Sequence, residues 1–222
     1  MARLYGKGQY NGEVLWFDGE RLKNVQGPGS PELRFPANLC QTCNNATSQP
    51  FDLAYDDWSD YILNDLDGIY RRQTLDMQQA LGDDWAARVD DLTRYFVKHI
   101  GCRMARDQVR VPDDLVDFLS GTGEPASLRC GYGIRKDLHK LHKKGRRHGD
   151  TFGGPWMRPL QCWYSPSIGE ITELESGYAL GFIEFWYWIR VDSARDKEEV
   201  FSDRPQSREV NLDKYGVSGP FA

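Results

Sequence analysis

Apolar side chains recur at steps of three and four residues after Pro50, which is the period of an amphipathic helix. The positions on this stripe are Phe51, Tyr55, Trp58, Ile62, Leu66 and Ile69. Pro50 suits the first turn of a helix, and the carboxylate of Asp52 complements the positive end of the helix dipole. The pattern therefore predicts a helix that begins near Phe51.

A second helix is predicted to begin near Asp83, whose side chain is suited to cap the backbone amides that follow. Its apolar stripe consists of Trp85, Val89, Leu92, Phe96 and Ile100. A short third helix is predicted in VPDDLVDFLSG, where Pro112 marks the start and Gly121 the end. We expect the middle of the chain to be helical.

The last part of the chain has the pattern of strands. Three β-prone runs, PLQCWYS, GEITELES and LGFIEFWYWIRVDS, are separated by turn signals and predict an antiparallel sheet. The first 36 residues are rich in turns, and their runs at Val14–Phe17 and Leu33–Phe35 suit a hairpin or a surface loop. Residues 121–158 receive no assignment, and the polar tail after Asp192 is expected to lie on the surface. The predicted fold class is α+β.

In the strand FIEFWYWIRV, alternate residues from Ile183 to Val191 form one apolar face. The other face presents Trp186 and Trp188 between Glu184 and Arg190. Indoles of this kind are able to stack on bases, but packing beneath a helix is the interpretation that we favour.

Composition narrows the class of protein. The chain has 222 residues, of which 40% are hydrophobic and 27% charged, which is typical of a soluble globular protein. No apolar run approaches the roughly 20 residues of a membrane span, and the N-terminus lacks a secretory signal. Its five cysteines form no framework of spacings, so a reducing compartment and a cytoplasmic location are expected.

Charge is distributed unevenly along the chain. The segment from Arg135 to His148 has a net charge of +6, and because the whole chain has −5, the remainder has −11. A concentrated basic segment on an acidic body points to a polyanion, and DNA is the expected partner. A solvated loop that only keeps the surface soluble is the alternative. The candidate phosphate-binding residues are Arg135, Lys136, Lys140, Lys143, Lys144, Arg146 and Arg147.

Cys40 and Cys43 form the C-x-x-C pair of the chain, directly before the first predicted helix. Two thiolates at this spacing are able to bind one zinc ion, but a tetrahedral structural site needs four ligands. A redox function needs a thioredoxin-like βαβ context, which the flanking pattern does not supply. The alternative is that both residues are small side chains at the start of a helix.

The segment NLCQTCNNATSQPFDLAYDDWSDYI, residues 38–62, resembles the second half of an HNH-type (ββα-metal) nuclease module. The resemblance is to a bacterial branch whose motif is C-x-x-C-N followed by S-Q-P-x-D. VQGPGSPELRFP, RYFVKHIGCRMA and VPDDLVDFL also resemble that group, so the similarity covers about the first 120 residues. It implies a partial ββα zinc-knuckle module at residues 1–80, with a helical and antiparallel-sheet region at residues 81–222.

The resemblance also implies ligands and chemistry. Cys40 and Cys43 match the second C-x-x-C of a structural zinc site, and Asn38 is similar to the Asn of the preceding N-L pair. Asn44 lies where many members have a His that binds the catalytic metal, and its amide oxygen suits a hard ion such as Mg²⁺ or Mn²⁺. The chemistry implied is metal-assisted hydrolysis of DNA phosphodiesters.

Two parts of the family pattern have no match. Neither a Cys nor a His precedes Cys40, so the first C-x-x-C and the general-base His are missing. We expect either that the missing half belongs to sequence upstream of Met1 or that the nuclease centre has decayed. A third option completes the zinc site with Cys102, Cys130, Cys162 or a later His. Cleavage is therefore expected to be impaired.

Other side chains offer weaker candidate sites. His99 and Cys102 are spaced to contact one ion from a helix, although a core histidine is the commoner outcome. His139 and His142 share a helical face, where exposed side chains are the expectation. Asp52, Asp56 and Asp60 are suited to Mg²⁺, but we favour their role as the acidic first turns of a helix.

Two functional hypotheses follow. The first is an HNH-endonuclease-like protein with impaired hydrolysis of DNA. The second is a non-catalytic, zinc-associated module that binds nucleic acid or protein.

Overall fold

The computed structural model describes residues 15–17, 21–25, 30–31, 42–147, 155–167, 169–191 and 209–211. By its contacts the chain divides into two units, residues 1–40 and residues 41–222. In the first unit, β1 (Leu15–Phe17) and β2 (Leu22–Asn24) form an antiparallel hairpin. The β-prone run predicted at Val14–Phe17 thus includes a strand, whereas the run at Leu33–Phe35 lies outside the described residues.

The second unit begins with helices. They are η2 (Cys43–Thr47), a π-helical turn, and the α-helices α2 (Gln49–Asn64), α3 (Leu66–Arg72), α4 (Met77–Leu81), α5 (Trp85–Arg106), α6 (Asp113–Leu119) and α7 (Lys136–Arg147). The three predicted helices are confirmed as α2, α5 and α6, although Leu66 and Ile69 of the first predicted stripe lie in the separate helix α3. The predicted cap of α5 is wrong, because Asp84 is the residue before the helix and the Trp85 amide instead donates to the Gly82 carbonyl at 3.1 Å.

The described residues of this unit also form seven strands. They are β3 (Thr74–Asp76), β4 (Leu128–Ile134), β5 (Pro155–Met157), β6 (Gln161–Ser165), β7 (Glu170–Leu180), β8 (Ile183–Arg190) and β9 (Glu209–Asn211). The main sheet has the order β4-β8-β7, and β5 and β6 both pair with β7. Every pairing is antiparallel, which confirms the α+β class with a C-terminal antiparallel sheet. β3 pairs with β9, so the tail contributes a strand.

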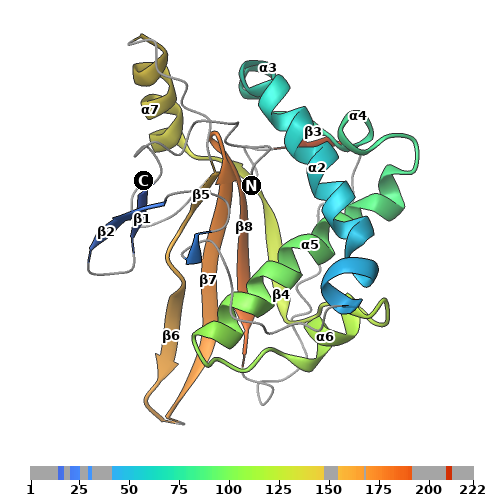
Figure 1. Ribbon diagram of the computed structural model, residues 1–222, viewed down its shortest axis with the longest axis vertical. Coiled ribbons are helices and arrows are strands. Elements are labelled where there is room, and N and C mark those ends of the chain that lie inside the picture. The colour runs from blue at the N-terminus through green and yellow to red at the C-terminus, as the bar shows by residue number, and fades with distance from the viewer. Residues whose placement is uncertain are drawn as a thin grey trace. The chain divides into compact units, whose positions relative to one another are not determined.

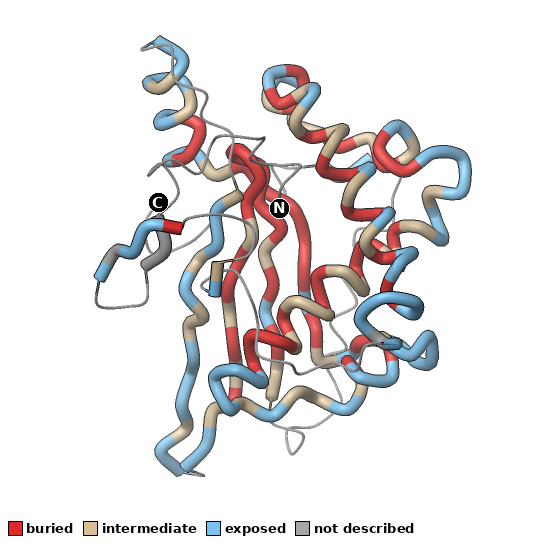
Figure 2. The backbone as a smooth tube through the Cα atoms, viewed as in Figure 1, coloured by how far each residue is buried: buried red, intermediate tan, exposed pale blue. Residues whose placement is uncertain are grey.

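Helices α2 and α5 cover one face of the main sheet (Figure 1). Trp58 of α2 contacts Tyr132 of β4 with ring centroids 5.7 Å apart, and Phe96 of α5 stacks on Phe185 of β8 at 3.9 Å. Buried residues concentrate along β4, β7 and β8 and on the facing sides of the two helices (Figure 2). The alternating residues Ile183, Phe185, Tyr187 and Ile189 belong to this core.

Trp186 and Trp188 alternate with those residues and therefore lie on the opposite face of the sheet. The helices α2 and α5 do not cover that face, and Trp188 is 38% exposed. The expectation that Trp188 packs beneath a helix is wrong, because the helices cover the face that carries Phe185 and Tyr187.

The turn between β7 and β8 places a buried aromatic side chain at the end of the sheet. Gly181 has φ +61°, a value that L side chains rarely adopt, and it is the first central residue of a two-residue hairpin turn. A Cβ at Gly181 would lie 2.9 Å from the methyl groups of Leu66 in α3. Glycine therefore allows both the turn and the close approach of α3, and it leaves Phe182 buried beside it.

A buried arginine links α5 to the sheet. Arg103 is 6% exposed, and its guanidinium donates to Ser176 Oγ at 2.9 Å, Tyr187 Oη at 2.8 Å and the Arg158 carbonyl at 2.9 Å. Burial raises the pKa of Tyr187, so its hydroxyl stays protonated and accepts this hydrogen bond.

Among the helices that the structure describes, none is long and apolar enough to cross a membrane.

Candidate nucleic-acid interface

Helix α7 contains residues 136–147 of the basic segment, for which the sequence pattern predicts no helix or strand. Lys136, Lys140, Lys143, Lys144 and Arg147 are spaced by three or four residues and so lie on one side of the helix. We call these five residues the basic stripe. At 1.5 Å per residue the basic stripe extends over about 17 Å.

The cations of the basic stripe face solvent, since all five residues are exposed. Within the described part of the chain, Lys136, Lys140, Lys144 and Arg147 form no ion pair. The Nζ atom of Lys143 lies 5.9 Å from the ring centroid of Tyr70, a cation–π contact at the margin of the stripe. Four positive charges are therefore available to an external anion.

The opposite side of α7 is fixed by aromatic packing. The ring of His139 stacks on Tyr70 of α3 at 3.8 Å and meets the edge of Phe182 at 4.9 Å. His142 lies 5.4 Å from Phe182. His139 is 7% exposed, so the expectation of an exposed side chain is wrong there. Burial also lowers the pKa of His139, which keeps the imidazole neutral in this packed position.

Arg146 differs from the basic stripe because it has a partner on α3. Its Nη1 atom lies 2.6 Å from Asp67 Oδ2, and the hydrogen bond lowers the pKa of Asp67. Both side chains are more than half exposed, so the pair adds little to stability but holds α7 against α3. One of the predicted phosphate-binding residues is thus neutralised within the fold.

Arg135, at the start of α7, is directed into a buried charge cluster. Its guanidinium pairs with Asp137 and also lies 3.3 Å from Glu184 Oε1. Arg158 approaches the same Glu184 oxygen at 2.8 Å through Nε. The Arg135 amide donates to the Phe182 carbonyl at 2.9 Å. Arg135 therefore connects α7 to the sheet and is not part of the basic stripe.

Glu184 is fully buried and sits where a neighbouring strand lacks a side chain. A Cβ at Gly177 of β7 would lie 2.3 Å from Glu184 Oε1 and 3.0 Å from Arg158 Nε. Burial raises the pKa of Glu184, although Arg158 and Arg135 act in the opposite direction. Its Oε2 atom has no hydrogen-bond partner among the described residues. This carboxyl is therefore under opposing electrostatic influences at the base of α7.

The predicted zinc ligands lie at the margin of the described residues. Cys40 and the side chain of Cys43 are outside them, while the backbone of Cys43 begins η2. Asn44 is exposed, and its carbonyl accepts a hydrogen bond from Ser48 Oγ at 2.7 Å. The described residues contain no group of three or more His, Cys, Asp or Glu that is placed to hold a metal ion. The zinc site and the Mg²⁺ or Mn²⁺ centre stay predictions.

The helical histidine of α5 lies in an aromatic environment. His99 is 4.6 Å from the ring of Tyr95, which stacks on Tyr55 at 4.0 Å. Burial lowers the pKa of His99 to about 4 and raises that of Tyr55 to about 12. Both groups are therefore neutral near pH 7.

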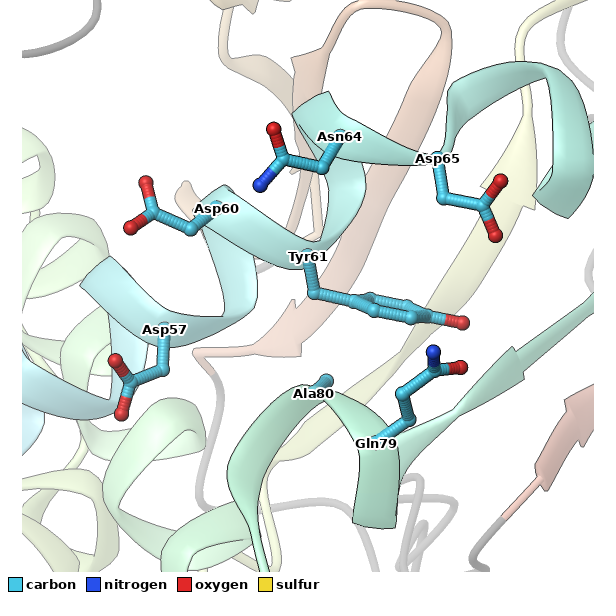
Figure 3. Close-up of a pocket in the computed structure, with 7 residues that line it drawn as sticks. All are labelled: Asp57, Asp60, Tyr61, Asn64, Asp65, Gln79 and Ala80. Atoms are coloured by element: carbon cyan, nitrogen blue, oxygen red, sulfur yellow. The ribbon is translucent and has the colours of Figure 1, made fainter.

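A pocket of about 400 Å³ lies between α2 and α4 (Figure 3). It is lined by Asp57, Asp60, Tyr61, Asn64, Asp65, Gln79 and Ala80. Two of its carboxylates form ion pairs at 2.7 Å, Asp57 with Arg88 and Asp65 with Arg72. The Tyr61 hydroxyl accepts a hydrogen bond from the Asp76 backbone amide at 3.2 Å. Arg88 and Arg72 thus pair with two of the three carboxylates of the lining, and the lining itself contains no cation that would attract phosphate.

Glu184 and Arg158 were not predicted as site residues. A single charged residue inside the apolar run FIEFWYWI was a usable signal, because a buried charge needs a partner. Arg158 gave no such signal, since its pairing depends on the sheet bringing residue 158 beside residue 177.

Comparison of the chain with known protein families, with curated proteins and with solved structures finds no match, so the site itself must support any function.

Proposed function

We propose that this chain is a nucleic-acid-binding protein that holds the phosphate backbone against the basic stripe of α7. The observation that carries the proposal is the arrangement of five exposed cations on one side of a helix whose other side is packed against α3 and Phe182. Any surface helix directs a charged side to solvent, but here the charges of the stripe are all positive, and four of them form no ion pair among the described residues.

The dimensions of the basic stripe suit a phosphate backbone. One strand of a duplex presents a phosphate about every 3.4 Å along the axis, so a stripe of about 17 Å matches about five phosphates. Lysine and arginine at these positions neutralise phosphates and release counterions, which gives affinity without sequence reading. The acidic remainder of the chain orients the polyanion toward α7.

The proposal concerns binding. The hydrolysis that the resemblance to HNH nucleases implies is supported by no grouping of ligands among the described residues, and it stays a prediction.

The test is a salt titration of DNA binding by a variant in which Lys140 and Lys144 are changed to Gln. The logarithm of the association constant is plotted against the logarithm of the salt concentration. If both lysines contact phosphate, the slope becomes shallower by about two units and affinity at low salt falls. Fluorescence anisotropy with a labelled DNA duplex provides the measurement.

The matched control changes Arg106 and Arg110 to Gln. These residues carry the same charge, lie outside α7, and form local pairs with Asp107 and Asp113. We expect the control to keep the wild-type slope. Equal effects of the two double variants would mean that net charge, and not the basic stripe, drives binding, and the proposal would be wrong.

A further inference from the structure

Two tryptophans stack on the sheet face that α2 and α5 do not cover. Trp163 of β6 and Trp188 of β8 lie on either side of β7, with ring centroids 5.3 Å apart and ring planes 10° from parallel. They are 40% and 38% exposed. Each indole thus covers one face of the other, and the remaining surface of the stacked pair is partly exposed to solvent on an antiparallel sheet.

An arginine lies beside each of two carboxylates around this pair, and one of the two carboxylates is ion-paired. Glu175 lies opposite Trp188 in the sheet register and pairs with Arg158 at 3.2 Å. Glu173 lies opposite Trp163, and Arg190 is its neighbour on β8. The surroundings of the indoles are therefore not strongly acidic, and they do not repel a phosphate backbone.

The position of the pair relative to the start of α7 follows from the strand register. Ile183 pairs with Ile134, which lies two residues before α7. Trp188 is five residues farther along β8, which is about 17 Å at the rise of an extended strand. A stacked strand that rises about 3.4 Å per nucleotide covers this distance in about five nucleotides.

The exposed indoles favour an unpaired strand as the ligand. Bases in a duplex are stacked on one another, so an indole reaches a base face only where the base is free. The exposed indoles are large enough for this, and each stacked base contributes enough free energy to change affinity about tenfold.

We propose that Trp163 and Trp188 form a stacking platform for unpaired bases, so that the ligand is single-stranded nucleic acid held by its phosphates on α7 and by its bases on the sheet. This inference rests on the proposed function of the basic stripe. To the proposed function it adds that the nucleic acid is single-stranded and that the indoles on the sheet form a second contact surface.

The test compares oligothymidylates of about four and about twelve nucleotides with a duplex of about twelve base pairs. Trp188→Ala and Trp163→Ala are expected to weaken binding of the longer single strand about tenfold, with an unchanged salt slope. The four-nucleotide strand and the duplex should bind the variants as they bind the wild type. Trp188→Phe should recover most of the affinity, because a smaller ring still stacks.

Tyr164→Ala is the matched control. Tyr164 is 60% exposed and follows Trp163 on the same strand, but among the described residues it makes no ring contact with Trp163 or Trp188. Thermal unfolding of each variant checks that the sheet is retained. Wild-type affinity of a folded Trp188→Ala variant for the longer strand would overturn the platform and leave the role of α7 intact. Absence of binding to every oligonucleotide by the wild type would overturn the proposed function itself.

Discussion

Glu184 illustrates how one residue connects the sheet to α7. A charged carboxylate inside a strand is costly unless partners compensate it, and Arg135 and Arg158 both approach its Oε1 atom. The space for this cluster exists because residue 177 on the neighbouring strand is glycine. The charge nevertheless remains disfavoured, since burial raises the pKa of Glu184 despite two arginines.

This balance predicts how stability depends on pH. A carboxyl whose pKa is raised in the folded state binds its proton more tightly there than in the unfolded chain. Its contribution to stability is therefore full below the ordinary Glu pKa of 4.5 and is lost as pH rises through the raised value. In Glu184→Gln this dependence disappears. Urea unfolding across a pH series should give a wild-type free energy that falls with rising pH relative to that of Glu184→Gln.

The control variant is Glu184→Ala. It removes the carboxyl and leaves a cavity and two arginines without their shared partner, so we expect a loss of about 3 kcal/mol. Glutamine should be tolerated better than alanine, because it keeps the volume and the hydrogen-bonding oxygen. A Gln variant with the same pH dependence as the wild type would show that another group titrates in this range.

At the scale of elements, the turn between β7 and β8 combines two demands on Gly181. Its φ of +61° is strained for other residues, and a Cβ there would also lie 2.9 Å from Leu66. Gly121 has φ +83°, and no atom lies within 4 Å of the position that a Cβ would take there. A substitution at Gly121 is therefore subject to the backbone strain but not to a steric contact.

We therefore expect Gly181→Ala to destabilise the protein by more than Gly121→Ala, which should cost about 1 kcal/mol. The difference measures the contact with α3, because the backbone strain is common to both variants. Chemical denaturation of both variants gives this comparison. Equal losses would mean that α3 shifts to accommodate the methyl group.

The sequence predicts elements well where the packed side is apolar. Helices α2 and α5 have continuous stripes such as Trp58 and Ile62 or Leu92 and Phe96, and both were predicted. Helix α7 was not, because its packed side includes His139 and His142, which a hydropathy pattern does not count as core. Only the fold supplies the rings of Tyr70 and Phe182 that bury His139.

Strand β4 was missed for a related reason. Gly131 and Gly133 weaken a strand pattern, yet in the sheet they face Trp186 and Glu184 of β8. The two glycines leave room for the side chains of Trp186 and Glu184, which lie on a strand more than 50 residues away in the sequence. The clustered cations, in contrast, were predictable from the sequence because their charge needs no tertiary context to be recognised.

For the whole molecule, charge separation is the property with the widest consequence. The basic segment carries a net +6 and the remainder of the chain −11, and the cations of the basic stripe are exposed together on α7. Such a surface orients a polyanion before contact and raises its association rate, an effect that salt screens over about 8 Å at physiological ionic strength. The same separation of charge is seen locally: the exposed cations lie on α7, and the pocket between α2 and α4 is lined by carboxylates.

Binding and cleavage make different demands on this molecule. Phosphate contacts need only exposed cations, whereas hydrolysis of the HNH type needs an imidazole whose pKa lies near the working pH and that faces a metal-bound water. Two of the described imidazoles, those of His99 and His139, are poorly suited to that task. Burial lowers the pKa of His99 to about 4, and His139 is packed between Tyr70 and Phe182.

We therefore expect the purified chain to bind plasmid DNA without nicking it in Mg²⁺ or Mn²⁺. Agarose gel electrophoresis of supercoiled plasmid, followed over time with a heat-denatured sample of the protein as control, provides the measurement. Metal-dependent nicking that disappears in His99→Ala, His139→Ala, His142→Ala or His148→Ala would contradict this expectation. It would mean that an imidazole from the later part of the chain acts as the general base, because no His precedes the Cys40 and Cys43 pair. The basic stripe would then position a substrate for chemistry as well as bind it.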